Sequence, residues 1–248
     1  SVVFLIPFIF FVAQKYFTRS MISKLVALFL LGAAQGLIGW IMVKSGLNDD
    51  NLYVSHIRLA VHFISALVLI GFTLWFALSL LIEEKHFVCN NSLKWLTGII
   101  ILLLFAQLTY GAFMAGLKAA TVAPTWPSIN GDYFPDSIWS QGFLYSAINI
   151  HFVHRMLAYV LLILLIFWFV KASSIKGFPL LSRYRFLPLL LVIVQIGLGI
   201  FCLFTSSMQV RNGFGVFEYL AQAHQLVAMF LLMSMLLMMF LLRRDSKV

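Results

Sequence analysis

Hydrophobic residues form six long stretches along the chain, separated by short segments that hold most of its charges. The stretches cover about residues 25–43, 59–82, 95–117, 144–170, 186–206 and 219–242. Each approaches the roughly 20 apolar residues with which an α-helix crosses a bilayer core about 30 Å thick. A seventh stretch, Ser1 to Ala13, reaches only about 20 Å at a helical rise of 1.5 Å per residue. The pattern predicts an all-α polytopic membrane protein with seven transmembrane segments, the first of them partial.

The composition points to the same class. Of the 248 residues, 62% are hydrophobic and 10% are charged, whereas soluble domains contain about 45–50% apolar and about 25% charged residues. This excludes a soluble enzyme, a disordered chain and, despite the net charge of +9, a nucleic-acid-binding protein. The two cysteines, Cys89 and Cys202, match no metal or redox spacing.

Basic residues are concentrated in alternate connections between the apolar stretches. The richer set holds Lys15, Arg19, Lys24, Lys85, Lys94, Lys171, Lys176, Arg183, Arg185, Arg243, Arg244 and Lys247, and the other holds Lys44, Arg58, Lys118, Arg155 and Arg211. The positive-inside rule places the richer set, and with it the C-terminus, in the cytoplasm. The longest loop, 118–143, is then outside. We favour a bacterial inner membrane over the mitochondrial inner membrane.

Two segments of the chain resemble each other. The pattern Gln-x-x-x-Gly followed by a histidine on the next stretch occurs at Gln35, Gly39 and His62 and again, 160 to 162 residues later, at Gln195, Gly199 and His224. A nearly constant offset favours a duplicated helix bundle. Chance is the alternative, because Gln107 and Gly111 repeat the first part of the pattern. Glycines such as Gly36 and Gly39 also let membrane helices approach closely.

The duplication predicts two pseudo-repeated four-helix bundles. Residues 1–117 would form an incomplete N-terminal half, 118–143 an outer cap, and 144–248 the C-terminal half. The same offset places a counterpart of His154 before Ser1, so we expect that the chain lacks one histidine.

Three of the six histidines lie at similar depth in the outer parts of apolar stretches. These are His62, His154 and His224. A lone buried histidine is more often structural, but three at one depth favour haem, for which two helices each provide an axial imidazole. Zinc prefers three or four ligands, copper usually adds Cys or Met, and a proton relay would use intramembrane carboxylates. We expect His56 to face water at an outer helix end and His86 to be solvated.

His151 and Arg155 flank the second of these histidines. His151 precedes His154 by three residues and so lies on nearly the same helix face. It is an alternative ligand, a supporting group or a propionate contact. Arg155 could bind an anionic haem propionate through two parallel hydrogen bonds. The alternative is that Arg155 only extends to the outer interface.

These motifs resemble those of the haem A synthase family. Residues 150–159, IHFVHRMLAY, are similar to the His-Arg helix of that family, and residues 115–131 to its outer-loop signature. Pro124 stands where the family commonly has Asn, and Ser-Ile-Asn precedes Gly131 where Leu-Met-Asp is common. Residues 58–62 and 223–225 resemble the other two histidine helices.

The resemblance implies eight transmembrane helices in two similar halves, each with a pair of histidines. The chain would then start within the second helix and lack a Glu-x-x-His-Arg segment with the fourth histidine. His154 and His224 would ligate a haem b, with Arg155 also binding this cofactor. His62 would be the catalytic residue that faces the substrate haem O, either ligating its iron or lining the pocket.

The implied reaction oxidises a ring methyl of haem O to a formyl group by successive hydroxylations, giving haem A for terminal oxidases. Its implied partners are haem O synthase, an electron donor such as a ferredoxin, and membrane lipid; a homo-oligomer is left open. One alternative is a di-haem b-type electron carrier without substrate oxidation. Another is a repeat-built transporter, which the continuous, nearly charge-free stretches disfavour.

Overall fold

The computed structural model describes residues 2–47, 52–136, 142–208 and 213–243. Arg211, Arg244 and Lys247 lie outside the described residues. The elements are the helices α1 (Val2–Ala13), α2 (Arg19–Val43), α3 (His56–Leu81), α4 (Asn91–Gly116), α5 (Ala119–Val122), α6 (Ala147–Ser173), α7 (Pro179–Tyr184), α8 (Leu187–Thr205) and α9 (Val216–Leu241), with 3-10 turns at Glu84–His86 and Ser206–Met208. Apart from one isolated bridge between Ile129 and Asp132, the described ranges contain no strand. The predicted all-α class is therefore confirmed.

The helices follow the predicted apolar stretches but extend into their polar flanks. Six are long and apolar enough to cross a membrane, and α1 is a shorter apolar helix, as predicted. Helix α2 starts six residues before the predicted stretch because the Thr18 hydroxyl caps it, accepting a hydrogen bond from the Met21 amide at 3.3 Å. Helix α6 starts at Ala147 because Ser146 caps it in the same way. A side-chain cap satisfies one of the amides that the first helical turn leaves unpaired.

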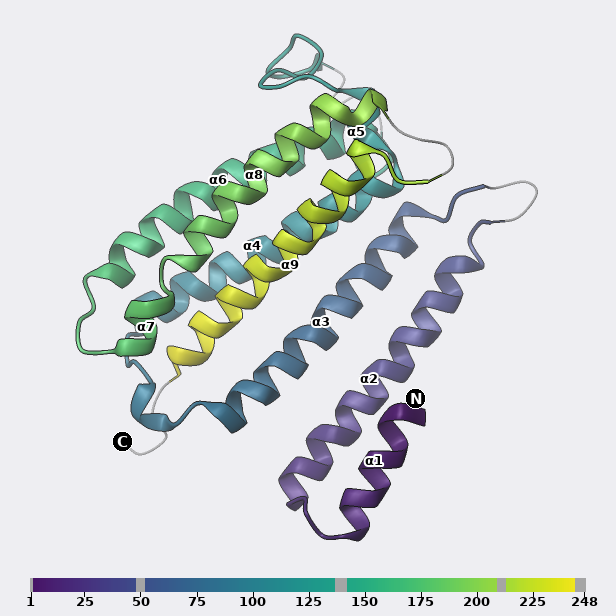
Figure 1. Cartoon of the computed structure of the whole chain (residues 1–248). Coiled ribbons are helices and arrows are strands. Elements are labelled where there is room, and N and C mark those ends of the chain that lie inside the picture. The colour runs from purple at the N-terminus through teal and green to yellow at the C-terminus, as the bar shows by residue number, and fades with distance from the viewer. Residues whose placement is uncertain (1, 48–51, 137–141, 209–212, 244–248) are drawn as a thin grey trace.

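Helices α4, α6, α8 and α9 form a four-helix bundle (Figure 1). Helix α4 packs on α6 and α9, and α8 also packs on α6 and α9, so α6 and α9 lie diagonally across the bundle. The core near α7 includes Leu165, Trp168 and Met235, each without exposed surface. There the indole Nε1 of Trp168 donates a hydrogen bond of 2.7 Å to the Thr97 hydroxyl.

Helices α1 to α3 continue from one side of this bundle (Figure 1). Helix α3 packs on α4 and α9, where Leu67, Leu108 and Leu232 share a buried cluster. Helix α2 packs on α3, and none of its residues is buried. Helix α1 folds back along α2, with the ring centroids of Phe4 and Phe29 5.9 Å apart.

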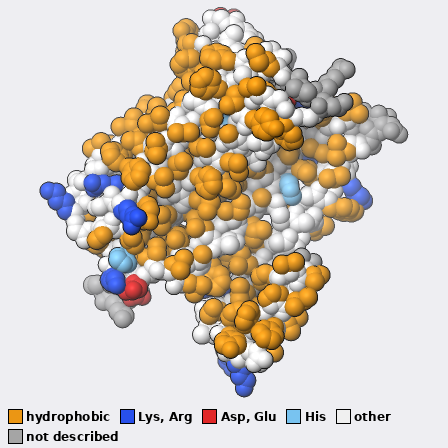
Figure 2. Space-filling model, in the orientation of Figure 1, with side chains coloured by type: hydrophobic (Ala, Val, Ile, Leu, Met, Phe, Trp, Pro, Cys, Tyr) orange, Lys and Arg blue, Asp and Glu red, His pale blue; other side chains and the backbone are white. Residues whose placement is uncertain are grey.

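The two predicted sets of connections lie at opposite ends of the helices (Figure 1). One end holds the α1–α2 and α3–α4 connections, α7 and the end of α9, where the Val88 amide donates to the Leu241 carbonyl at 2.8 Å. Lys85 lies 2.6 Å from the Glu83 carboxylate there and lowers the pKa of that carboxyl. We call this the inner end and the opposite one the outer end. Between them, hydrophobic side chains cover much of the surface (Figure 2), as lipid contact requires.

Candidate functional site

The three histidines singled out in the sequence occupy equivalent places on three helices. His62, His154 and His224 lie six, seven and eight residues after the first residues of α3, α6 and α9. At 1.5 Å per residue, each is about 9–12 Å along its helix from the outer end. The helices therefore hold the three imidazoles at matched depth, with His154 and His224 on the two diagonal helices of the bundle.

His224 has one ring nitrogen fixed by the neighbouring helix. Its Nδ1 lies 3.0 Å from the backbone carbonyl oxygen of Gln195 on α8. A carbonyl only accepts hydrogen bonds, so Nδ1 carries the proton and Nε2 keeps its lone pair. This arrangement is typical of metal-ligating histidines, whose second nitrogen usually donates to a carbonyl or carboxylate.

His154 contacts a glutamine on the adjacent helix instead. The side-chain amide nitrogen of Gln107 on α4 lies 3.3 Å from its Nε2. Within the described residues, the buried Nδ1 of His154 and the Oε1 atoms of Gln107 and Gln195 have no hydrogen-bond partner.

His62 is held on the α2 side of α3. The Gln35 side-chain amide donates both to the His62 Nδ1 at 3.2 Å and to its backbone carbonyl at 3.1 Å. The Ser65 hydroxyl donates to the Gln35 Oε1 at 2.5 Å, which sets the orientation of the amide. The ring of His62 is thereby fixed through Nδ1.

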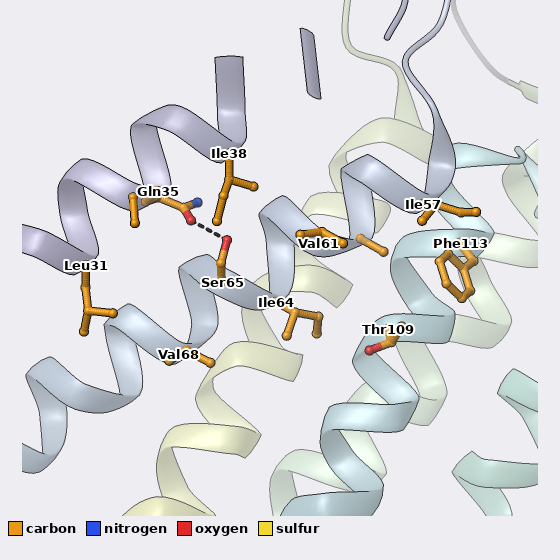
Figure 3. Close-up of a pocket in the computed structure, with 12 residues that line it drawn as sticks. Leu31, Gln35, Ile38, Ile57, Val61, Ile64, Ser65, Val68, Thr109 and Phe113 are labelled. Atoms are coloured by element: carbon orange, nitrogen blue, oxygen red, sulfur yellow. Dashed lines mark hydrogen bonds between the residues drawn. The ribbon is translucent and has the colours of Figure 1, made fainter. Parts of the chain in front are cut away.

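An apolar cavity of about 500 Å³ adjoins this hydrogen-bond network. Figure 3 shows its walls, formed by α2, α3 and α4, with the Gln35–Ser65 hydrogen bond on one side. Val61, the neighbour of His62, and Phe113 of α4 are among the lining residues. The volume falls within the range of about 300–1,000 Å³ that small-molecule sites occupy.

Arg155 connects the histidine helix to the outer loop. Its guanidinium donates to the carbonyl oxygens of Thr125 at 2.6 Å, Ser128 at 3.0 Å, Pro127 at 3.1 Å and Ala123 at 3.4 Å. Arg155 is 7% exposed, so these bonds form in a buried environment. Its side chain thus holds the loop that follows α5 against the outer end of α6.

A second contact closes the same loop onto α6. The indole nitrogen of Trp126 lies 3.2 Å from the Tyr159 hydroxyl, four residues after Arg155. Sequence reasoning did not pair these two side chains, because they are 33 residues apart. The sequence does show that Arg155 and Tyr159 are four residues apart. They therefore lie on one face of α6, where both can contact the same loop.

His151 is 1% exposed, and neither of its ring nitrogens has a partner in the described part of the chain. His151 is therefore a buried imidazole one helical turn before His154, with both ring nitrogens free among the described residues.

His56 differs from expectation: it is 9% exposed rather than facing water. Its Nε2 lies 2.9 Å from the Leu144 carbonyl, and its ring packs edge-on against Phe113. The residues just before α6, Leu144 and Tyr145, contact His56 at this helix end, which the apolar pattern of α3 alone does not reveal.

Among the described residues, no group of three or more His, Cys, Asp or Glu side chains is arranged to hold a metal ion. The donor set therefore lacks the three or four protein ligands of a typical zinc centre. His62, His154 and His224 come from three different helices, and imidazoles from two helices are a donor set that a haem iron can use.

Comparison with known proteins assigns the family. The cytochrome oxidase assembly protein family matches residues 1–236. Curated haem A synthases are similar: that of Flavobacterium johnsoniae is 32% identical, with 95% of this chain and 68% of that protein covered. Those of Parvibaculum lavamentivorans (36% identical, 71% and 52% covered) and Maricaulis maris (37% identical, 81% and 59% covered) are similar too. No solved structure matches.

The chain therefore spans from about half to about two thirds of the length of these relatives. The family match and the haem A synthases agree with the resemblance seen in the His-Arg segment and the outer loop. The chain belongs to the cytochrome oxidase assembly protein family, among the haem A synthases.

Proposed function

We propose that the chain is a haem A synthase that oxidises a ring methyl of haem O to a formyl group. The observation that carries the proposal is the family match over residues 1–236, which includes His62, His154 and His224. The same match supports a role in haem A biosynthesis for cytochrome oxidase, an integral-membrane process suited to the six apolar helices. The finer assignments below rest on the side chains.

His154 and His224 are proposed as the axial ligands of a haem b between α6 and α9. The residues fit this group, because diagonal helices place two imidazoles at one depth and His224 keeps its Nε2 lone pair. The Gln107 amide donates to the Nε2 of His154 at 3.3 Å and occupies its lone pair, so this nitrogen would bind iron only if Gln107 releases it. When bound, a haem b supplies one-electron transfer. The protein provides two fixed imidazoles and an apolar, water-poor bundle around them.

His62 is proposed as the catalytic residue on the substrate side. It lies on α3, outside the four-helix bundle, and the predicted boundary at residue 117 does not separate the halves, because α4 packs within that bundle. Its ring is oriented by Gln35, which also lines the apolar cavity where the hydrophobic part of a porphyrin would bind; His62 itself is not among the lining residues. Apolar walls exclude water from a reacting centre, which strengthens the polar contacts that remain there. In this proposal Gln35 and Ser65 orient the imidazole, and α4 closes the third wall.

Arg155 is proposed to act in cofactor binding through the outer end of α6. Its two terminal nitrogens bond to the loop carbonyls, while its buried Nε has no partner within the described residues. A buried guanidinium one residue after His154 brings positive charge to the end of the bundle where anionic propionates would be favourable. Arg155 would thus both order the cap and attract the acidic edge of the cofactor.

The reaction requires partners of stated chemistry. Haem O must come from a haem O synthase. Successive hydroxylations of its methyl group need an oxidant such as O2 together with electrons from a separate donor such as a ferredoxin. Membrane lipid surrounds the helices, and we propose a bacterial inner membrane with the C-terminus in the cytoplasm, because the basic residues concentrate at the inner end.

Haem extraction tests the proposed activity. The chain is expressed together with a haem O synthase in a bacterial host that makes no haem A, and the extracted haems are separated and weighed by mass spectrometry. Haem A is expected when the chain carries the N-terminal segment that its relatives have, and not when that same version carries His62→Ala. Haem b bound to the purified chain without any haem A in the extract would instead favour the di-haem electron carrier.

A further inference from the structure

Three glycines, on three different helices, face an imidazole ring. A Cβ built on Gly39 would lie 2.9 Å from the Cε1 of His62, and one on Gly199 would lie 3.1 Å from the Cε1 of His224. One on Gly111 would lie 3.4 Å from the Cε1 of His154. In each case the same edge of the ring points at the glycine.

A glutamine stands four residues before each of these glycines and contacts the same histidine. Gln35 and Gln107 reach His62 and His154 with their side-chain amides, at 3.2 and 3.3 Å. Gln195 reaches the third histidine with its backbone carbonyl, at 3.0 Å. Residues four apart lie on one helix face, so the glutamine and the glycine together contact one imidazole.

Two neighbouring glycines show that this arrangement differs from ordinary close packing of membrane helices. Gly36 and Gly197 lie in the same two segments, and a Cβ at either would meet nothing within 4 Å. Close approach between the helices is therefore not required along the whole small-residue segment. It is required at Gly39 and Gly199, and there the neighbouring atom belongs to the imidazole.

We propose that Gln-x-x-x-Gly is a histidine seat used three times in this chain. In each seat the glycine makes room for the Cε1 edge of the ring, and the glutamine fixes one ring nitrogen. Gly111, Gly199 and Gln107 are then positioning residues for the pair His154 and His224. This inference rests on the proposed function, because it takes haem as the group toward which the rings are directed.

The seats explain why the pattern at Gln107 and Gly111 lies outside the 160-residue repeat. It forms the seat for His154, whereas the other two serve His62 and His224. The distances also rank the seats. At less than 3.0 Å an added methyl group must displace the ring, at 3.1 Å the ring must shift by a few tenths of an ångström, and at 3.4 Å the contact is ordinary.

A matched pair of alanine variants tests the proposal. The purified 248-residue chain is titrated with ferric haem b, and absorbance and electron paramagnetic resonance (EPR) spectra report affinity and axial ligation. We expect Gly199→Ala to weaken haem b binding by about 10- to 100-fold, the usual effect of disturbing a group that orients a metal ligand. Its low-spin EPR signal should shift or broaden. Gly197→Ala, two residues away in the same helix, should match the unchanged chain in both readouts.

Folding is followed in parallel by helical circular dichroism. Alanine is a better helix former than glycine, so both variants should remain folded. Gly111→Ala provides a second test and should have a smaller effect than Gly199→Ala, because its Cβ makes an ordinary contact. Equal spectra and affinities for Gly199→Ala and Gly197→Ala would overturn the proposal. Failure of the unchanged chain to bind haem b would contradict the proposed function instead.

Discussion

Replacing Arg155 by leucine removes the four hydrogen bonds that join the outer loop to α6. The three shorter ones measure 2.6, 3.0 and 3.1 Å. A hydrogen bond to a charged group contributes about 1.5–3 kcal/mol, but these three share one guanidinium and are not additive. We therefore expect the loop to lose about 3 kcal/mol of local stability. At 1.4 kcal/mol per factor of ten, this is about a 100-fold increase in loop opening.

Hydrogen–deuterium exchange with mass spectrometry measures this effect. The reporters are the amides of Ile129, which donates to the Asp132 carbonyl at 2.7 Å, and Asn130, which donates to the Thr125 hydroxyl at 2.8 Å. Both should exchange about 100-fold faster in Arg155→Leu, while peptides from the inner end of α9 stay unchanged.

Arg58→Leu is the matched control for this substitution. Arg58 also lies near the outer end, but its side chain is exposed and makes one bond, of 3.1 Å, to the Ile41 carbonyl. It should leave exchange at Ile129 and Asn130 unaltered. Equal exchange in Arg155→Leu and the unchanged chain would refute the reasoning, because it would mean that the guanidinium does not hold the loop.

Two further predictions concern the core and the orientation. Trp168→Phe removes the buried hydrogen bond to Thr97 and should lower the free energy of unfolding by about 1 kcal/mol, which is measured as a lower midpoint of thermal unfolding in detergent. Trp95→Phe, at a 76% exposed position, should leave the midpoint unchanged. Equal shifts in the two variants would contradict this account. Cys89 is exposed in the α3–α4 connection and Cys202 is buried, so a membrane-impermeant maleimide should label Cys89 in inverted vesicles and not in intact cells. Labelling in intact cells alone would reverse the assigned orientation.

The helices follow from the sequence because their cause is local. An apolar stretch of about 20 residues has few alternatives to a membrane helix, since only helices satisfy their own backbone in lipid. The helix ends differed by up to six residues because caps such as Thr18 and Ser146 depend on single hydroxyls. The apolar pattern does not register them.

The site could be predicted only in its residue types and depth. The spacing of His62, His154 and His224 along the chain indicated one level in the membrane, and the helices hold them there. Which group contacts each imidazole depends on how helices pair, which the sequence does not state. For that reason Gln107 resembled a chance match, and the bonds of Arg155 to the outer loop were not foreseen.

The central claim is that His154 and His224 together ligate a haem b. The most direct measurement is the EPR spectrum of the purified chain loaded with ferric haem b, compared among His154→Ala, His224→Ala and His151→Ala. The account predicts a low-spin signal from two axial imidazoles that is lost in the first two variants and retained in the third. A low-spin signal that persists in His224→Ala, or disappears in His151→Ala, would contradict it.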